Sequence, residues 1–230
     1  MTKRAAPRRS PRDGGYAPGG EARARIIEAA LQIFADEGYE RASTRQIAAA
    51  AAVNPPAVQY YFESKGGLHA ACAEFMAERV TERLRSSYAV ADEALASGGE
   101  GAAADALVGL LDALLSLSLE SDPSPSWSRF LVRTQAERVG AGYPLARDRI
   151  HGPLFRKCAA LAATATGAQP ADEGPKLMAL LLLNQLSAFS THRDSTLAAL
   201  EWLDLDRGRS QMLRAALRRA TFGVLASPAI

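Results

Sequence analysis

The sequence contains few of the residues on which metal and redox chemistry depend, with only two cysteines and three histidines among 230 residues. Cys72 and Cys158 stand alone in apolar helical patterns, without the paired spacing of a disulfide framework or a metal site. We therefore predict two buried free thiols and a reducing, cytoplasmic location. HExxH, GxSxG, CxxC and glycine-rich phosphate-binding patterns are also missing. The sequence thus indicates no enzyme, no cofactor and no metal site.

Long hydrophobic runs are scarce as well. The most hydrophobic one, Leu177–Leu183, is far shorter than the roughly 20 residues that a bilayer-spanning helix needs. The basic N-terminal stretch is not followed by the apolar segment of a signal peptide. We expect neither a membrane partner nor secretion.

Charge is distributed unevenly along the chain. The formal net charge is +2, but residues 1–25 contain seven basic and two acidic side chains, a local net charge of +5. Residues 1–20 are rich in Pro, Gly and Arg and have little to bury. This composition predicts a mobile basic arm.

From residue 21 onward, apolar residues recur at helical spacing, and no stretch alternates as a strand would. The predicted fold class is all-α. Its expected organisation is a basic arm (1–20), a unit of short helices (21–67) and a larger helical domain (68–230). The expected helices cover 21–37, 44–50, 56–62, 65 to the mid-80s, 101–119, 127–139, 145–166 with a kink or split at Gly152–Pro153, 176–191 and 208–225.

A tight three-residue turn at 51–53 follows the second expected helix and leads through Asn54 and Pro55 into the third, which is typical of a helix-turn-helix. Ser43 and Gln46 have capping-box spacing at the start of the second helix. The third helix corresponds to the one that enters the DNA major groove in such motifs. Val58 and Phe62 lie four residues apart on it and are expected to pack inward.

Two prolines stand at the start of this third helix. Proline in a first helical turn forfeits no hydrogen bond, because the first N–H groups of a helix have no internal partner. The sequence leaves two registers open. Either Asn54 caps the helix, or Pro55 is the cap and Pro56 the first helical residue.

The segment that contains these helices resembles a known family. "RARIIEAALQIFADEGYERASTRQIAAAAAVNPPAVQYYFESKGGL" (23–68) looks like the DNA-binding domain of TetR-family transcriptional regulators. The matching elements are "A…F…GY" in the first helix, "STRQIA" opening the second and "YYF.SK" closing the third. Later segments, "FLVRTQAERV", "RIHGPLFRKCAALAA" and "LLLLNQLSAFSTHRD", resemble the C-terminal domain of the CecR/YbiH-type subgroup.

The resemblance implies contacts with double-stranded DNA, approached by the capped third helix. The residues it marks are Thr44 and Arg45 at the head of the second helix, Asn54, Pro55, Pro56 and Ala57 at the tip of the third, and Tyr60, Tyr61 and Lys65 as phosphate contacts. Gln59 replaces a tyrosine of the family motif, and its amide either contacts phosphate or reads adenine. Ala52 stands where the family's turn has glycine, so the turn either keeps a positive φ at a cost or relaxes. The basic arm either follows DNA beside this site or is a solubilising tail.

The larger domain is expected to form a homodimer. Leu177–Leu183 is apolar on all sides, which predicts a helix covered all round, and the last helix has two apolar stripes. TetR-like proteins dimerise through their last two helices, and a twofold dimer predicts a palindromic operator.

The resemblance further implies a pocket for a small apolar or amphipathic effector. The predicted lining combines large apolar and polar residues: Trp127, Phe130, Leu131, Arg133, His151, Phe155, Asn184 and Gln185. The last two amides either serve this pocket or bond across the dimer interface. The predicted function is a ligand-released repressor. The alternatives are a regulator without a ligand and an adaptor that no longer binds DNA.

Overall fold

The computed structural model describes residues 18–119, 126–186, 188 and 193–226. Within these ranges the chain forms helices and no strands, which confirms the all-α prediction. Cys72 and Cys158 are both buried and outside any disulfide, as predicted. The basic arm up to residue 17 lies outside the described residues.

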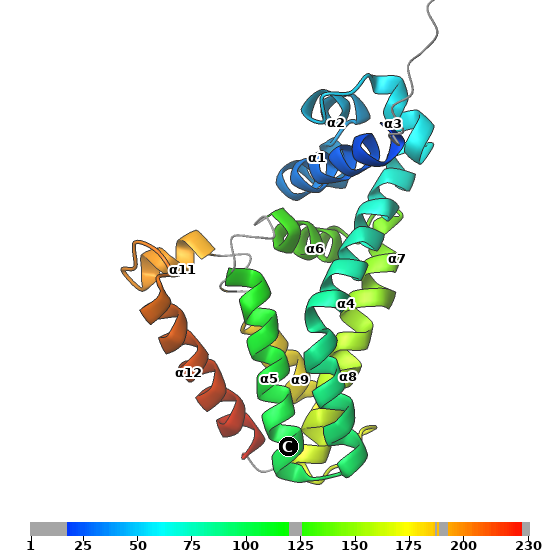
Figure 1. Cartoon of the computed structure of the whole chain (residues 1–230). Coiled ribbons are helices and arrows are strands. Elements are labelled where there is room, and N and C mark those ends of the chain that lie inside the picture. The colour runs from blue at the N-terminus through cyan, green and yellow to red at the C-terminus, as the bar shows by residue number, and fades with distance from the viewer. Residues whose placement is uncertain (1–17, 120–125, 187, 189–192, 227–230) are drawn as a thin grey trace, which may run out of the picture.

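The helices form an elongated molecule in which a compact unit sits on one end of a bundle (Figure 1). α4 starts beside this unit and runs the length of the molecule, α5 packs back along it, and α6 crosses next to α1. The unit contains α1 (Pro18–Arg41), α2 (Thr44–Ala50) and α3 (Pro55–Phe62). The bundle contains α4 (Lys65–Ser97), α5 (Glu100–Leu119), α6 (Ser126–Glu137), α7 (Gly142–Ala146), η1 (Arg147–His151), α8 (Gly152–Thr166), α9 (Glu173–Asn184), α11 (Arg193–Ala199) and α12 (Arg207–Leu225).

Several boundaries differ from the prediction. α4 continues to Ser97 and does not end in the mid-80s, because its inner face, including Leu84 and Ala91, stays buried against the bundle. The irregularity expected at Gly152–Pro153 is a π-helical segment, η1, immediately before it. α9 begins three residues before the expected start, and α11 was not predicted.

Buried apolar side chains form two clusters. The first combines α1, α2 and α3 with the beginning of α4 up to Ala77, and it includes Phe130 from α6 and Ile150 from η1. The second lies among α4, α5, α8, α9 and α12, and Val80 packs against both clusters. The first cluster therefore crosses the domain boundary expected at 67/68 and joins the compact unit to the bundle.

α1 is interrupted at Gly38, where the stop was predicted, and then resumes to Arg41. Gly38 has φ 84° and ψ 169°, a backbone conformation that essentially only glycine adopts. A Cβ at this position would lie 2.1 Å from Oε1 of Glu137 and 2.9 Å from Nε of Arg133, both on α6. The backbone conformation requires glycine here, and an added Cβ would also displace the side chains of Glu137 and Arg133.

His69 on α4 is buried where the compact unit meets the bundle, against the rings of Phe34 and Tyr39. Its Nδ1 accepts the N–H of Gly142 at 3.2 Å, and its Nε2 lies 3.4 Å from Oγ1 of Thr134. Burial lowers the pKa of His69 to about 4. The ring is therefore neutral near pH 7, which suits an Nδ1 that accepts a hydrogen bond.

We expect Gly38→Ala to lower the free energy of unfolding by about 2 kcal/mol or more, because it adds both backbone strain and overlap with α6. Gly109→Ala is the matched control, since Gly109 is exposed within α5 and an added Cβ meets nothing within 4 Å. Alanine there should stabilise the protein by about 0.5–1 kcal/mol. Urea unfolding measures both changes, and shifts of the same sign would contradict this account of Gly38.

The pKa of His69 also predicts a dependence of stability on pH. The folded-state value of about 4 lies below the ordinary 6.5, so the unfolded chain binds a proton more readily. The contribution of His69 to the free energy of unfolding is therefore fully present above pH 6.5. It is lost as the pH drops from 6.5 towards 4, by roughly 3 kcal/mol in total. His69→Gln should be less stable near pH 7 but should lose this part of the pH dependence. Thermal unfolding between about pH 7.5 and about pH 4.5 tests this, and parallel Tm curves for the two proteins would refute it.

Candidate nucleic-acid interface and effector region

α2 begins with the capping box that the sequence predicts. The Ser43 hydroxyl accepts the backbone N–H of Gln46 at 3.2 Å, and the Gln46 side chain accepts the backbone N–H of Ser43 at 3.0 Å. The Gln46 amide also donates to the Glu37 carboxylate on α1. These bonds fix the start of α2, where Thr44 is half-buried and Arg45 is exposed.

The turn between α2 and α3 holds Ala52 in the left-handed region, with φ 52°. The N–H of Val53 closes the turn by donating to the carbonyl of Ala48 at 3.0 Å. An alanine in this conformation costs about 1–2 kcal/mol. Of the two possibilities left by the sequence, the turn keeps the positive φ and does not relax.

Asn54 caps α3, because its Oδ1 accepts the N–H of Ala57 at 3.1 Å. Pro55 and Pro56 then occupy the first helical turn, where their missing N–H groups forfeit nothing. This settles the register that the sequence left open. The start of α3 is consequently a rigid tip with few hydrogen-bond donors.

α3 has a buried face and an exposed face. Val58 and Phe62 are buried, as predicted, while Gln59 is exposed and Tyr60 is 81% exposed. Tyr61 is half-buried, with its ring edge-on to Tyr60 at a centroid distance of 5.1 Å. The helix therefore presents its proline tip and these polar side chains to solvent. Their contacts with DNA stay a prediction.

Lys65 has a role in the fold that sequence reasoning missed. Its ammonium donates to the carbonyl oxygens of Tyr39, Glu40 and Ala42 at 2.9, 3.1 and 3.2 Å. A lysine ammonium has three N–H donors, so all three are engaged. Lys65 thus ties the start of α4 to the end of α1, and its phosphate contact stays a prediction.

The connection from α3 to α4 was also missed, because no sequence pattern marks a glutamate for positive φ. Glu63 has φ 63° and ψ −39°, and the N–H of Ser64 donates to the carbonyl of Phe62 at 2.6 Å. This is a γ-turn with positive φ, a rare and strained form. α3 therefore stands between two non-glycine residues of positive φ, Ala52 and Glu63.

Arg133, predicted to line the effector pocket, is directed towards the compact unit. Its Nη1 donates to the carbonyl oxygens of Ala35 and Asp36 at 3.1 and 2.9 Å, and its Nε pairs with Glu137 at 2.8 Å. Glu137 in turn accepts the backbone N–H of Tyr39 at 3.0 Å. Burial alone would raise the pKa of Glu137, but the hydrogen bonds from Arg133 and Tyr39 outweigh it and hold the pKa below its usual range.

The aromatic and apolar effector candidates are divided between the two clusters. Phe130 is fully buried in the first cluster, and Trp127 packs edge-on against Phe75 of α4 at a centroid distance of 5.5 Å. Leu131 is partly buried against the same cluster, and Phe155 against the second. The structure therefore does not bring these four side chains together in one cluster.

The polar candidates separate as well. Asn184 is exposed and its Nδ2 donates to the carbonyl of Leu180 at 2.9 Å. Gln185 is half-buried, and its Nε2 is buried without a partner among the described residues. Nε2 of His151 is in the same condition, and burial lowers the pKa of this imidazole. Buried polar atoms normally have a hydrogen-bond partner, so these two atoms are exceptions among the described residues.

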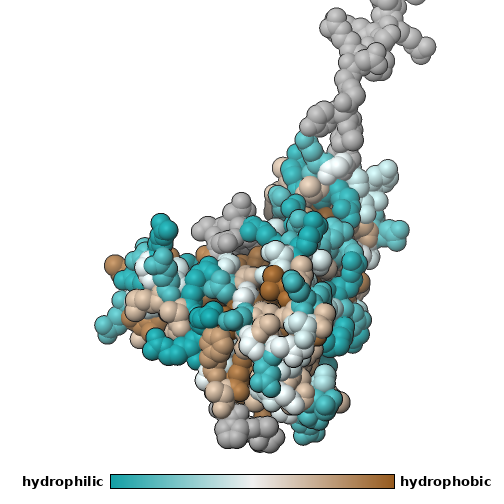
Figure 2. Space-filling model, turned by 60° about the horizontal axis from the view of Figure 1, so that its bottom comes forward, coloured by the Kyte–Doolittle hydropathy of each residue, from teal (hydrophilic) through white to brown (hydrophobic). Residues whose placement is uncertain are grey.

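Large apolar side chains are exposed mainly towards the C-terminal part of the chain. On α9, Leu177, Leu180 and Leu181 are 41%, 48% and 55% exposed, and on α12 Met212 is 64% exposed. Figure 2 shows hydrophobic surface on the bundle, while the helix-turn-helix end is mostly hydrophilic in that view. The α9 run that was expected to be covered all round thus has one face open in the single chain.

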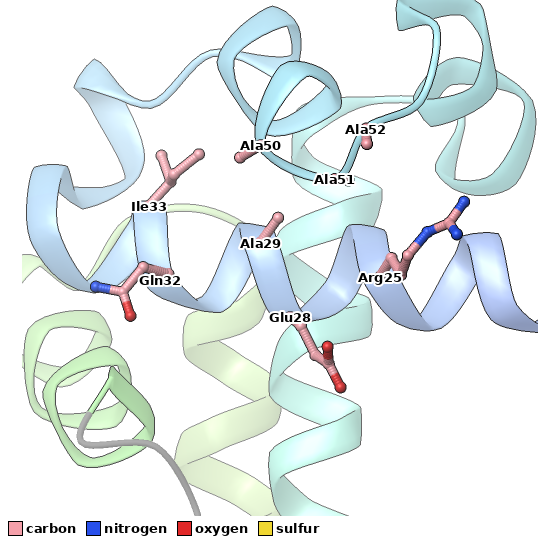
Figure 3. Close-up of a pocket in the computed structure, with 8 residues that line it drawn as sticks. All are labelled: Arg25, Glu28, Ala29, Gln32, Ile33, Ala50, Ala51 and Ala52. Atoms are coloured by element: carbon pink, nitrogen blue, oxygen red, sulfur yellow. The ribbon is translucent and has the colours of Figure 1, made fainter.

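Two hollows on the described surface lie away from the predicted effector residues. One, of about 500 Å³, runs between α5 and α12 and is edged by the ion pairs Arg214–Asp112 and Arg218–Asp105. The other, of about 460 Å³, lies between α1 and the end of α2. Figure 3 shows its small apolar wall, made of Ala29, Ile33 and residues 50–52, with Arg25, Glu28 and Gln32 around it.

No group of three or more His, Cys, Asp or Glu side chains in the described ranges is placed to hold a metal ion. Among the same residues, no helix combines the length and the apolar character needed to cross a membrane.

Comparison with known proteins matches both parts of the chain. Residues 26–72 match the family model of bacterial regulatory proteins of the tetR family, and residues 103–226 match that of the C-terminal domain of the HTH-type transcriptional dual regulator CecR. The CecR protein of Shigella flexneri is 29% identical over 197 residues, which cover 85% of this chain and 87% of that protein.

Solved structures show the same fold. A TetR-like transcriptional regulator from Rhodococcus sp. RHA1 is 20% identical with a TM-score of 0.63, covering 90% of this chain and 97% of that one. AibR, solved with isovaleryl coenzyme A and operator DNA, is 16% identical with a TM-score of 0.62, covering 86% and 97%. Since both the helix-turn-helix unit and the larger domain are matched, the chain belongs to the TetR family of DNA-binding transcriptional regulators and carries a CecR-type C-terminal domain.

Proposed function

We propose that the protein is a dimeric repressor that binds a palindromic operator and releases it when a small apolar or amphipathic effector binds to the larger domain. The observation that carries the DNA-binding part is α3 itself. It is capped by Asn54, anchored by Val58 and Phe62, and exposed at its tip and along Gln59 and Tyr60. A helix of this kind enters the major groove with its N-terminus first.

The proposed contacts divide into positioning and reading. Thr44, Arg45, Tyr60 and Tyr61 lie at the helix ends and sides that meet the phosphate backbone. Lys65 adds only its positive charge there, since its three N–H donors bind carbonyl oxygens of the chain itself. Asn54, Pro55, Pro56 and Ala57 form the tip that approaches base edges. Because this tip has few donors, selectivity rests on the Gln59 amide, on apolar contact with thymine methyl groups and on DNA shape.

A second copy of the chain is the proposed cover for the open face of α9. Leu177, Leu181 and Asn184 are separated by four and three residues, so they share one helical face, and all three are exposed. α12 buries Leu217 against its own chain and leaves Met212 outward. A twofold dimer through these two helices would cover the apolar surface and present two α3 helices to one palindrome.

The effector is proposed to bind on the inner side of α9. Met178, Leu182 and Gln185 share that face, and Gln185 is the residue whose amide nitrogen has no partner among the described residues. His151, at the end of η1, has a similarly unpartnered nitrogen. We propose that Gln185 belongs to the pocket and Asn184 to the dimer interface. The ligand and operator held by AibR, a protein of the same fold, support such a site.

DNA-contact variants should separate charge from hydrogen bonding. Tyr60→Phe removes only the exposed phenolic hydroxyl and should weaken binding by about 3- to 10-fold on every sequence, with an unchanged salt dependence. Arg45→Ala should lower the slope of log affinity against log salt by about one. Tyr143→Phe, in the bundle, is the control and should change neither. Fluorescence anisotropy on operator and random DNA measures these effects, and a loss confined to particular sequences would show that Tyr60 reads bases.

Effector binding should be detectable as an increase in the thermal stability of the protein. A true effector raises Tm as its concentration rises, corresponding to about 2.7 kcal/mol at 100 times its Kd, and it releases the operator. Gln185→Leu should abolish both responses without weakening the operator complex, whereas Asn184→Ala should keep both. The measurement is a Tm and DNA-release screen with metabolite extract fractions. If the operator is bound and no fraction acts on the wild type, the ligand-independent alternative replaces this proposal.

A further inference from the structure

At the contact between α1 and α6, side chains of α6 form hydrogen bonds with backbone groups of α1 that would otherwise bind water. Arg133 donates to the carbonyl oxygens of Ala35 and Asp36, which lie at the end of the regular part of α1. Glu137 accepts the N–H of Tyr39, the first residue after the break at Gly38. Carbonyl groups at a helix end have no partner within the helix. α6 therefore caps α1 across the boundary between the two parts of the molecule.

Arg133 and Glu137 are named here the α1–α6 bridge. They pair with each other at 2.8 Å, and their side chains are only 33% and 29% exposed. The absence of a Cβ at Gly38 is what allows Glu137 to approach so closely. The backbone break and the bridge thus depend on each other.

The same segment is held from its other side by the helix-turn-helix. Lys65 binds the carbonyls of Tyr39, Glu40 and Ala42, and Gln46 of α2 binds the side chain of Glu37. Residue 43, the cap of α2, follows directly. Residues 35–42 therefore connect α6 with α2 and α4 through short, directional bonds.

We propose that Arg133 and Glu137 are positioning residues. They set the angle between the compact unit of α1, α2 and α3 and the bundle in each subunit of the dimer, and thereby the half-site spacing that the operator must have. This inference rests on the proposed dimeric binding of a palindrome. A rigid junction penalises any operator in which the two half-sites are too close or too far apart. A loosened junction lets each α3 adjust, so the penalty falls.

The experiment measures affinity for a series of operators that differ only in half-site spacing. The operator is first selected from random DNA with the wild-type protein, and its spacer is then shortened and lengthened by about one and two base pairs. Arg133→Met/Glu137→Met removes the bridge and retains side chains of similar length. The ratio of affinities for the best and the shifted spacing should fall by about fivefold or more, as for a typical coupling between sites.

Arg129→Met is the matched control. Arg129 pairs with Asp36 on the same α1–α6 face, but both side chains are about 45% exposed and the pair holds no backbone group. Its spacing profile should match that of the wild type. Tm and molar mass in solution establish that each variant is folded and has the wild-type oligomeric state. If the double variant does not fold, Arg133→Met alone is tested, because Glu137 then still accepts the Tyr39 N–H.

The outcomes separate this inference from the proposed function. A variant that loses affinity equally at every spacing has lost general stability, and the positioning role is overturned. The role is also overturned if the wild-type preference persists unchanged in the variants. If the wild-type protein binds a single half-site as tightly as any palindrome, the proposed binding of a palindrome by a dimer is overturned, and the positioning role falls with it.

Discussion

The end of α1 is the constraint on which the rest of the molecule depends. Its last carbonyl groups have no partners within the helix, and the break at Gly38 interrupts the helical backbone next to them. Leaving such groups buried and unpaired is costly, so they recruit side chains from outside. Arg133 and Glu137 reach them from the bundle, and Lys65 reaches them from the start of α4. The two parts of the protein are thereby joined through the peptide groups of one short segment.

A short helix such as α3 contributes little to its own stability. With eight residues, α3 is too short to persist alone in water, so its position comes from Val58, Phe62 and the Asn54 cap. The exposed face of α3 is therefore not needed to hold the helix in place. Its flanking residues, Ala52 and Glu63, are held at positive φ, which fixes the direction of α3 at the cost of backbone strain.

In the larger domain, the leucine-rich sequence of α9 is nearly uniform, but the two faces of this helix have different environments. The inner face of α9 contributes Met178 and Leu182 to the second cluster, while Leu177 and Leu181 are exposed. Neighbouring amides are separated by the same geometry, because successive residues on a helix are rotated by about 100°. Asn184 and Gln185 therefore belong to different surfaces, and a substitution at one is not equivalent to a substitution at the other.

The sequence alone determined the features that depend on neighbouring residues. Apolar periodicity indicated the all-α class, Ser43 and Gln46 indicated the cap of α2, and short helices joined by a three-residue turn indicated the helix-turn-helix, because these signals lie within a few residues of each other. Tertiary structure decided what depends on residues far apart in the chain. Arg133 and Phe130 were predicted to line a pocket, yet one caps α1 and the other is buried in the first cluster. Lys65 carries a charge that suggests phosphate, yet its donors are engaged by carbonyls about 25 residues earlier. No local pattern encodes these partners, since a guanidinium or an ammonium binds whichever acceptors the completed fold brings within reach.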